Sequence, residues 1–229
     1  MARKTVYFPH NKLLFVILSI ILFMIVGLFL VGAISSAFLE VGFSPTITII
    51  ILFATFLGGS VNIPLLKLKA TMPVVRDEFV TSFGMPYRIP NLEYEEATTL
   101  VAVNVGGALI PTFVASYLLY KLPSAALWSL VGIILVALVT HVLAKPVSGV
   151  GIVTPAIVPP LAAALVGLLL PSGAPRVVAY VSGVIGTLIG ADLSNLAAIP
   201  RLGAPVVSIG GAGTFDGVFL SGIIAVLLA

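Results

Sequence analysis

The sequence contains no cysteine, and only 8% of its 229 residues are charged. The absence of cysteine excludes disulfides and thiolate metal sites. Two histidines, His10 and His141, are too few for a metal site built from imidazoles. No phosphate-binding, dinucleotide-binding or haem-attachment motif is present, so no cofactor is expected. A soluble domain of this length would carry more surface charge, and 60% of the residues are hydrophobic, so the composition predicts an integral membrane protein.

Long apolar runs fill most of the chain. A membrane-spanning helix needs roughly 17–25 residues, and seven segments meet this length: about 13–38, 45–63, 98–120, 124–144, 153–170, 177–197 and 212–229. The first run exceeds the roughly 7–15 residues of a signal-peptide core, so we expect it to be retained. The fifth contains Pro155, Pro159 and Pro160, so its first turns are expected to be broken or re-entrant. The pattern predicts an all-α bundle of seven spans in a single transmembrane domain, residues 1–229.

The basic residues indicate how these spans are oriented. With the N-terminus in the cytoplasm, all eleven Lys and Arg residues fall in cytoplasmic segments except Lys121 and Arg176. Because Lys and Arg are enriched on the cytoplasmic side, this pattern predicts an N-in, C-out multi-pass protein of the plasma membrane, in contact with its lipids. The net charge of +3 is too small to indicate nucleic-acid binding.

One sizeable polar stretch, about 65–97, is expected to form a cytoplasmic loop. Within it, β-prone runs at 74–80 and 87–89 flank a turn signal at 82–86, which predicts a short β-hairpin. Glu93, Glu95 and Glu96 precede the third apolar segment, where acidic side chains favour a helix N-terminus.

Weak internal similarity relates the two halves of the chain. The second and sixth apolar segments both end in stretches that combine glycine, serine and asparagine, at 58–64 and 190–195. Asn104 lies near the start of the third segment, as Asp216 lies near the start of the seventh. This arrangement predicts a parallel duplication, with three spans in each half and the fourth as the connector.

Two aspartates, Asp192 and Asp216, lie inside the last two apolar segments. A carboxylate at membrane depth costs roughly 2.5–3.5 kcal/mol, so an intramembrane acid is a candidate functional residue. At a rise of about 1.5 Å per residue, Asp192 lies about 9 Å, and Asp216 about 6 Å, from the cytoplasmic ends of their helices. The two acids are therefore expected to share one layer near the cytoplasmic surface.

Close packing of the sixth and seventh helices would bring these carboxyl groups together. Two carboxyl groups that face each other in a low-dielectric site cannot both ionise easily, so they share one proton. Aspartic proteases use such a pair, in which one group activates water while the other polarises the scissile carbonyl. Small residues that allow close helix contact flank both acids: Gly186, Gly190, Gly213, Gly217, Ser221 and Gly222.

Residues 213–228 resemble the GxGD helix of the presenilin and signal peptide peptidase class of intramembrane aspartyl proteases. The shared features are Gly213 three residues before Asp216, small residues one turn later and an aliphatic tail. The resemblance implies that Asp192 and Asp216 are the catalytic pair and that the substrate is a transmembrane peptide. It also implies a Pro-Ala-Leu element at the substrate side of the site, for which Pro155-Ala156-Ile157 is the candidate.

The chain departs from that class at several positions. Phe215 replaces the second glycine of the motif, and Ala191 stands where a tyrosine normally precedes the first aspartate. The Pro-Ala-Ile element precedes the aspartates instead of following them, and the two final helices of that class have no counterpart. Over its whole length the chain looks more like uncharacterised seven-span membrane proteins of prokaryotes.

A short β-prone run, residues 204–209, lies between the two aspartates. If the chain is a protease, this run can pair with an unwound substrate by strand addition; otherwise it is an ordinary interfacial loop.

Two other classes of function fit the same residues. In a secondary transporter or ion-coupled carrier, Asp192 and Asp216 would line a cation or proton site with Asn62, Asn104 and Asn195. In a non-catalytic membrane scaffold, the acids would only pair with basic side chains or hydrogen-bond to the backbone of glycine-rich helices.

Overall fold

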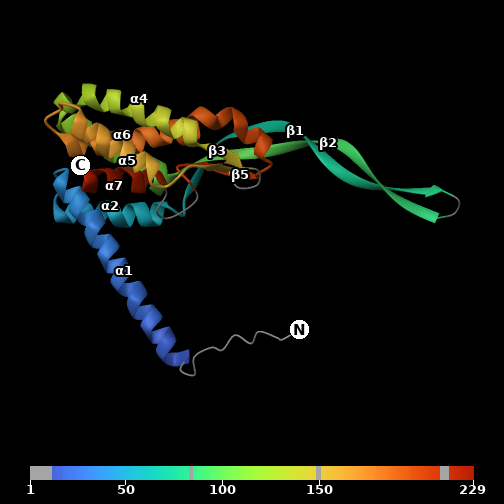
Figure 1. The fold of residues 1–229 in the computed structure, drawn as a ribbon, viewed down its shortest axis with the longest axis horizontal. Helices are drawn as coiled ribbons and strands as arrows, with labels where there is room; N and C mark the ends of the chain where they lie inside the picture. The colour runs from blue at the N-terminus through green and yellow to red at the C-terminus, as the bar shows by residue number, and fades with distance from the viewer. Residues whose placement is uncertain (1–11, 83–84, 148–150, 212–216) are drawn as a thin grey trace, which may run out of the picture.

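The computed structural model describes residues 12–82, 85–147, 151–211 and 217–229. It shows a helical bundle from one end of which a long two-stranded β-arm extends (Figure 1). The α-helices are α1 (Lys12–Glu40), α2 (Pro45–Gly58), α3 (Ile110–Lys121), α4 (Ala126–Leu143), α5 (Val158–Leu169), α6 (Pro175–Thr187) and α7 (Gly217–Leu228). The strands are β1 (Asn62–Ser82), β2 (Met85–Asn104), β3 (Lys145–Val147), β4 (Gly151–Val153) and β5 (Val206–Ile209).

Several helices are extended by turns of tighter or wider winding. A π-helix, Val105–Leu109, leads from β2 into α3, and a second, Leu188–Asp192, continues α6. A 3₁₀-helix, Leu193–Leu202, follows the second π-helix and ends at Gly203, whose φ of +67° is the left-handed conformation that glycine adopts readily. Another 3₁₀ turn, Pro123–Ala125, joins α3 to α4.

In the described part of the chain, three helices are long and apolar enough to cross a membrane: Val16–Glu40, Pro123–Leu143 and Pro175–Pro200. Three further apolar helices are shorter: Pro45–Gly58, Val158–Leu169 and Gly217–Leu228. The chain is therefore a membrane protein that is mostly helical, with a smaller β-component.

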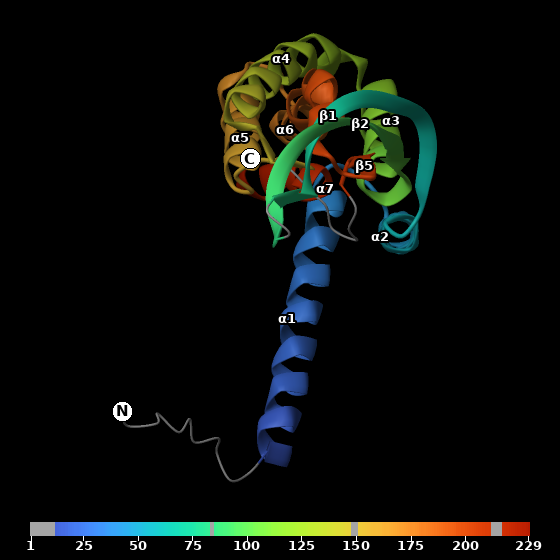
Figure 2. The same cartoon turned by 90° about the vertical axis from the view of Figure 1, so that its right-hand side faces the viewer.

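Helix α6 lies at the centre of the bundle, between α4, α5 and α7 (Figure 2). Its residues 177–184 are all buried, and α1 adds Phe38 to the same core, against Tyr180 and Phe219. Among the described side chains of α1, those packed in this way lie in its C-terminal part, because large apolar side chains nearer its start, such as Phe29, are exposed. In Figures 1 and 2, α1 accordingly runs obliquely away from the bundle.

Glycine sets the separation between α6 and its neighbours. A Cβ at Gly190 would lie 2.4 Å from the carbonyl oxygen of Ala137, and one at Gly186 would lie 2.7 Å from Cβ of Val136. Both contacts are with α4, so the expectation that these two glycines pack against the seventh helix is wrong. The contact between α6 and α7 relies instead on Gly183 and Gly222.

Strands β1 and β2 form one continuous antiparallel ladder, from the pair Asn62↔Asn104 to the pair Ser82↔Met85. At about 3.3 Å per residue, this arm is about 65 Å long. Strand β5 pairs in parallel with residues 100–103 of β2, which gives the strand order β1-β2-β5. Strands β3 and β4 form a separate small hairpin.

The structure contains the predicted hairpin, with Ser82 paired to Met85, but it is not the short element that the sequence predicted. Residues 83–84 of the predicted turn lie outside the described residues. Its strands extend past the expected loop, about 65–97, to Asn62 and Asn104. Residues 98–104, assigned to the third helix, belong to β2, and helical winding begins only at Val105. Glu93, Glu95 and Glu96 therefore lie within a strand and not at a helix N-terminus. The run 98–103, Thr-Thr-Leu-Val-Ala-Val, is rich in β-branched residues, which pack well on a pleated sheet.

Candidate functional site

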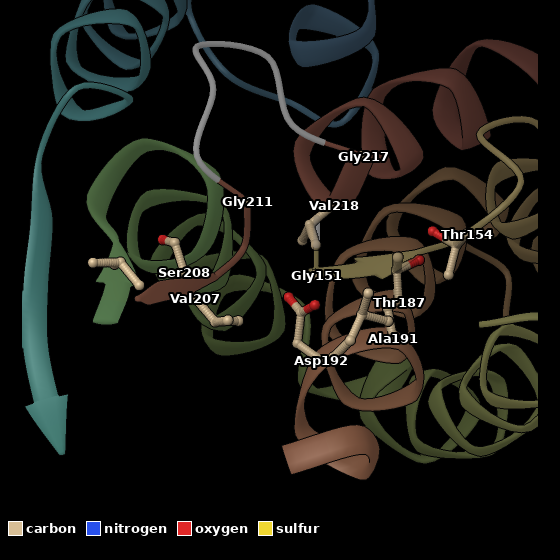
Figure 3. Close-up of a pocket in the computed structure, with 12 residues that line it drawn as sticks. Gly151, Thr154, Thr187, Ala191, Asp192, Val207, Ser208, Gly211, Gly217 and Val218 are labelled. Atoms are coloured by element: carbon tan, nitrogen blue, oxygen red, sulfur yellow. The ribbon is translucent and has the colours of Figure 1, made fainter. Parts of the chain in front are cut away.

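A polar pocket of about 180 Å³ lies where the β-arm joins the helical bundle. The end of α6, strands β4 and β5, and the first turn of α7 form its walls (Figure 3). Twelve residues line it: Gly151, Ile152, Thr154, Thr187, Ala191, Asp192, Val206, Val207, Ser208, Gly211, Gly217 and Val218.

Asp192 is the acidic residue of this wall. It is the last residue of the π-helix that continues α6, and it is half-buried. Its Oδ2 accepts a hydrogen bond from the backbone N–H of Gly210 at 2.7 Å. In Figure 3 its carboxylate points from the end of α6 toward the first turn of α7. The carboxylate is thus held by the turn that follows β5.

Two consecutive glycines shape that turn. Gly210 and Gly211 have φ angles of +79° and +77°, which residues with a Cβ rarely adopt. A Cβ at Gly210 would also lie 2.5 Å from Cβ of Ala108 in the first π-helix. Glycine at this position therefore allows the turn to press against the bundle and to direct its N–H at Asp192.

The opposite wall begins at Gly217, the first residue of α7. Asp216, the residue before it in the chain, lies outside the described residues, as does Gly213. The structure therefore describes one acid of the predicted pair, Asp192, and Gly217, the residue next to the other acid.

Hydroxyl groups supply most of the remaining polarity of the pocket. Thr187 Oγ1 lies 3.1 Å from Ser221 Oγ across the α6–α7 contact. Ser208 of β5 donates to Asn62 Oδ1 at 2.5 Å. Thr154 follows β4, and Figure 3 shows its side chain on the far side of the pocket from β5. These three hydroxyl residues were not identified from the sequence as one site, because they come from separate elements.

One of these residues, Thr187, is related to Asp192 by the spacing of a π-helix. Thr187 precedes Asp192 by five residues, and a π-helix brings residues at this spacing onto one face. An α-helical projection uses spacings of three and four residues and does not reveal this neighbour.

The asparagines that a transporter would need are bound to other protein groups. Asn104 is fully buried and donates to the carbonyl oxygen of Gly59 at 2.8 Å and to Asn62 Oδ1 at 3.1 Å. Its own Oδ1 accepts from the N–H of Gly107 at 2.7 Å, so it caps the π-helix. Asn195 donates to the carbonyl oxygens of the second π-helix, among them that of Ala191 at 2.8 Å. These three residues join elements and do not line the pocket.

The predicted Pro-Ala-Ile element lies beside the pocket. Pro155, Ala156 and Ile157 are exposed and precede α5, whereas residues 151–154, directly before them, supply lining residues. The structure therefore places this element next to the pocket but not among its lining residues.

A serine–histidine contact lies two residues beyond Asp192. His141 Nδ1 of α4 is 2.7 Å from Ser194 Oγ, and Ser194 donates to the carbonyl oxygen of Gly190 at 2.7 Å. Because the hydroxyl proton is bound to that carbonyl, the imidazole donates to the serine and does not activate it as a nucleophile. The contact joins α4 to the 3₁₀-helix that follows the end of α6.

Comparison with known proteins places the chain in a family. Residues 56–228 match the family model described as "Protein of unknown function (DUF1614)", and the chain belongs to this family. No curated protein and no solved structure matches the chain. Within the described residues, no group of three or more His, Asp or Glu side chains is placed to hold a metal ion.

Proposed function

We propose that this protein is a diaspartyl intramembrane hydrolase that cleaves a transmembrane peptide with Asp192 and Asp216. The observation that carries the proposal is the position of Asp192 in a polar pocket whose opposite wall starts at Gly217, one residue after Asp216. The resemblance of residues 213–228 to the GxGD helix supports the same pair. Hydroxyl and carboxyl oxygens in the pocket also provide the polar surroundings that water needs to enter an otherwise apolar bundle.

In the proposed reaction the two carboxyl groups share one proton. The ionised group removes a proton from water as the water oxygen attacks the peptide carbonyl carbon, and the protonated group donates to the carbonyl oxygen. The tetrahedral intermediate then collapses, the C–N bond breaks, and a carboxyl group supplies the proton that the leaving nitrogen takes up. The hydrogen bond from Gly210 to Asp192 fixes the orientation of this carboxylate.

Strand β5 supports a mode of substrate binding. Within the described residues it pairs with β2 on one side and forms one edge of the three-stranded sheet. Val206, Val207 and Ser208 of β5 also line the pocket. An unwound segment of substrate that added to this edge would therefore pass beside Asp192.

The proposal includes seven spans in N-in, C-out orientation, with the β-arm in the cytoplasm. Supporting this, the β-arm and the loops at its end of the bundle hold Lys67, Lys69, Arg76, Arg88 and Lys145, whereas the other end holds Lys121 and Arg176. On this topology the pocket lies at the cytoplasmic end of the bundle of a plasma-membrane protein.

A cleavage assay in liposomes tests the proposal. Purified protein is reconstituted with a panel of fluorogenic transmembrane peptides and, in parallel, exposed to a photoreactive hydroxyethylene transition-state analogue. Asp192→Asn and Asp216→Asn are each expected to reduce cleavage by about 10²–10⁴-fold and to abolish labelling. Asp77→Asn, on the β-arm, is the matched control and should leave both unchanged. Cleavage that survives in both Asp192→Asn and Asp216→Asn would rule out the diaspartyl mechanism.

A secondary transporter is the second candidate, because one feature of the fold is repeated. Strands β2 and β5 run parallel and each leads toward an apolar helix, α3 and α7 respectively. This arrangement supports the 3+1+3 duplication and an ion or proton site at the contact between its halves. Proton flux into the same liposomes, lost in Asp192→Asn, would favour this function. A scaffold would show neither cleavage nor flux.

A further inference from the structure

An apolar groove lies between α2 and α3, and it has no lining residue in common with the pocket that holds Asp192. Its volume is about 340 Å³. Nine residues line it, and all but the tyrosine hydroxyl are apolar: Phe43, Ile47, Ile50, Ile51, Ala54, Ile110, Phe113, Val114 and Tyr117.

The groove lies between two close contacts, one between the end of α2 and the π-helix that precedes α3, and one between Phe43, just before α2, and α3. At one end the backbones meet at Gly58 and Gly106, where a Cβ on Gly106 would lie 2.2 Å from the carbonyl oxygen of Thr55. At the other end the rings of Phe43 and Tyr117 stack with centroids 5.6 Å apart. The groove is therefore a slot of defined length along the two helices.

Each helix presents one continuous stripe to this slot. Residues 47, 50, 51 and 54 of α2 and residues 110, 113, 114 and 117 of α3 follow the i, i+3, i+4, i+7 spacing of a single helical face. Lys121 continues the α3 stripe by one turn, and its Nζ lies 5.6 Å from the centroid of the Tyr117 ring. The slot is thus apolar along its length and basic at one end.

Lys121 differs from the other basic residue at this end of the bundle. Arg176 is paired with Glu40, with Nε and Oε2 3.2 Å apart. In the described part of the chain, no carboxylate lies within 4.0 Å of the Lys121 ammonium group. Helix α2 begins beside the same end, so the positive end of its dipole adds to the field of the lysine. The potential at this end of the slot therefore favours an anion.

We propose that this slot binds an anionic phospholipid, with one acyl chain between α2 and α3 and the phosphate on Lys121. The charge at the end of the slot argues for a lipid with net negative charge. The uniformly apolar walls argue for a hydrocarbon chain rather than a polar peptide. The site is independent of the proposed hydrolase activity, since none of its residues lines the pocket of Asp192.

Quenching by brominated lipids tests the site. The chain has one tryptophan, Trp128, so a Trp128→Phe background allows a single reporter to be placed by Phe113→Trp inside the slot. The probes are dibrominated phosphatidylglycerol and dibrominated phosphatidylcholine, mixed in turn into liposomes of the unbrominated lipids. We expect phosphatidylglycerol to be preferred about fivefold at low salt, the effect of about one basic residue near a membrane surface. The preference should weaken as salt is raised.

Matched variants identify the residues responsible. A reporter placed by Phe29→Trp samples bulk lipid, because Phe29 of α1 is 74% exposed, close to the 72% of Phe113; it should show no preference. Lys121→Gln should abolish the preference of the slot reporter, whereas Lys145→Gln, an exposed lysine at the other end of the bundle, should not. If Phe113→Trp does not fold, Ile50→Trp places the reporter on the opposite wall.

Two results would overturn the proposal. Equal quenching by the two lipids at the slot reporter would show that the slot does not select anionic lipid. A preference that survives Lys121→Gln would show that the headgroup is bound elsewhere.

Discussion

Asp192 owes its position to backbone conformations that glycine makes accessible. The turn at Gly210 and Gly211 returns the chain from β5 to the bundle and supplies the N–H that holds the carboxylate. The π-helix then determines which way Asp192 points, because the wider winding rotates it relative to an α-helical continuation of α6. Such local departures are common at functional sites, which supports assigning a role to this residue.

A pair of cysteines tests whether the two acids face each other. The native chain has none, so Asp192→Cys with Asp216→Cys in membranes gives an unambiguous readout. We expect efficient disulfide formation on mild oxidation, which requires Cα atoms within about 7 Å. Glu78→Cys with Asp216→Cys is the control, because Glu78 lies in the distal part of the β-arm. Absence of a cross-link in the first pair under strong oxidant would separate the acids and end the hydrolase proposal.

Adding a single methyl group at Gly190 should destabilise the protein. A Cβ there would lie 2.4 Å from the backbone oxygen of Ala137, and backbone cannot move aside as a flexible side chain can. Gly190→Ala should therefore lower the free energy of unfolding by about 1–3 kcal/mol. Gly32→Ala, in α1, meets no atom within 4 Å and is the matched control. Thermal unfolding in detergent checks both, and equal midpoints would contradict the close approach of α4 and α6.

At the scale of elements, the β-arm is separable from the bundle. Its distal part extends away from the helices (Figure 1), and none of the described side chains of 69–98 belongs to the buried clusters of the bundle. Replacing residues 72–95 by Asn-Gly, a favoured two-residue hairpin turn, would join the paired residues Thr71 and Glu96. We expect the shortened protein to unfold at the same temperature as the full chain.

The base of the arm should behave differently. Val101 is fully buried against Ile199 and Ile209, so Val101→Asp places an unpaired carboxylate in an apolar cluster and should prevent stable folding. A large loss of stability in the shortened arm, or none in Val101→Asp, would show that the division between arm and base is misplaced.

The same arm shows what local sequence can and cannot establish. The turn near 82–86 and its flanking β-prone runs have local signals, and the hairpin was predicted there. The run 98–104 contains a short apolar core, residues 100–103, and such a run fits a buried strand or the start of a buried helix equally well. This run is a strand because it pairs with β1 and with β5, which lies about a hundred residues later in the chain. No local sequence pattern predicts that pairing.

In the pocket, too, only the residues with a local sequence signal could be predicted. Asp192 and Gly217 could be selected from the sequence because an acid in an apolar segment and glycines beside a second acid are local signals. Thr154, Thr187 and Ser208 could not, since ordinary hydroxyl residues gain significance only where separate elements meet. The transporter hypothesis uses Asn104 as a ligand of the ion site. In the structure Asn104 is a buried helix cap that hydrogen-bonds to the backbone of Gly59 and Gly107 and to the side chain of Asn62.

At the scale of the whole molecule, the two ends of the bundle differ in chemistry. The β-arm, the pocket and most of the basic side chains that the structure describes lie at one end, and Lys121, Arg176 and Tyr120 lie at the other. If the bundle spans a membrane with the arm inside, a site at each end must be reachable from a different compartment. Glu78 of the arm and Ser124 of the α3–α4 turn are both exposed and mark the two ends.

Single-cysteine labelling measures this asymmetry directly. In intact cells, a membrane-impermeant maleimide should label the Ser124→Cys variant at once, and the Glu78→Cys variant only after the membrane is permeabilised. Inverted vesicles should reverse the pattern, which controls for differences in intrinsic reactivity. Labelling of both positions from the same side would mean that α3 and its π-helical extension do not cross the bilayer. Labelling of Glu78→Cys alone from outside would place the pocket on the outer surface, and a hydrolase there would act on segments that emerge outside the cell.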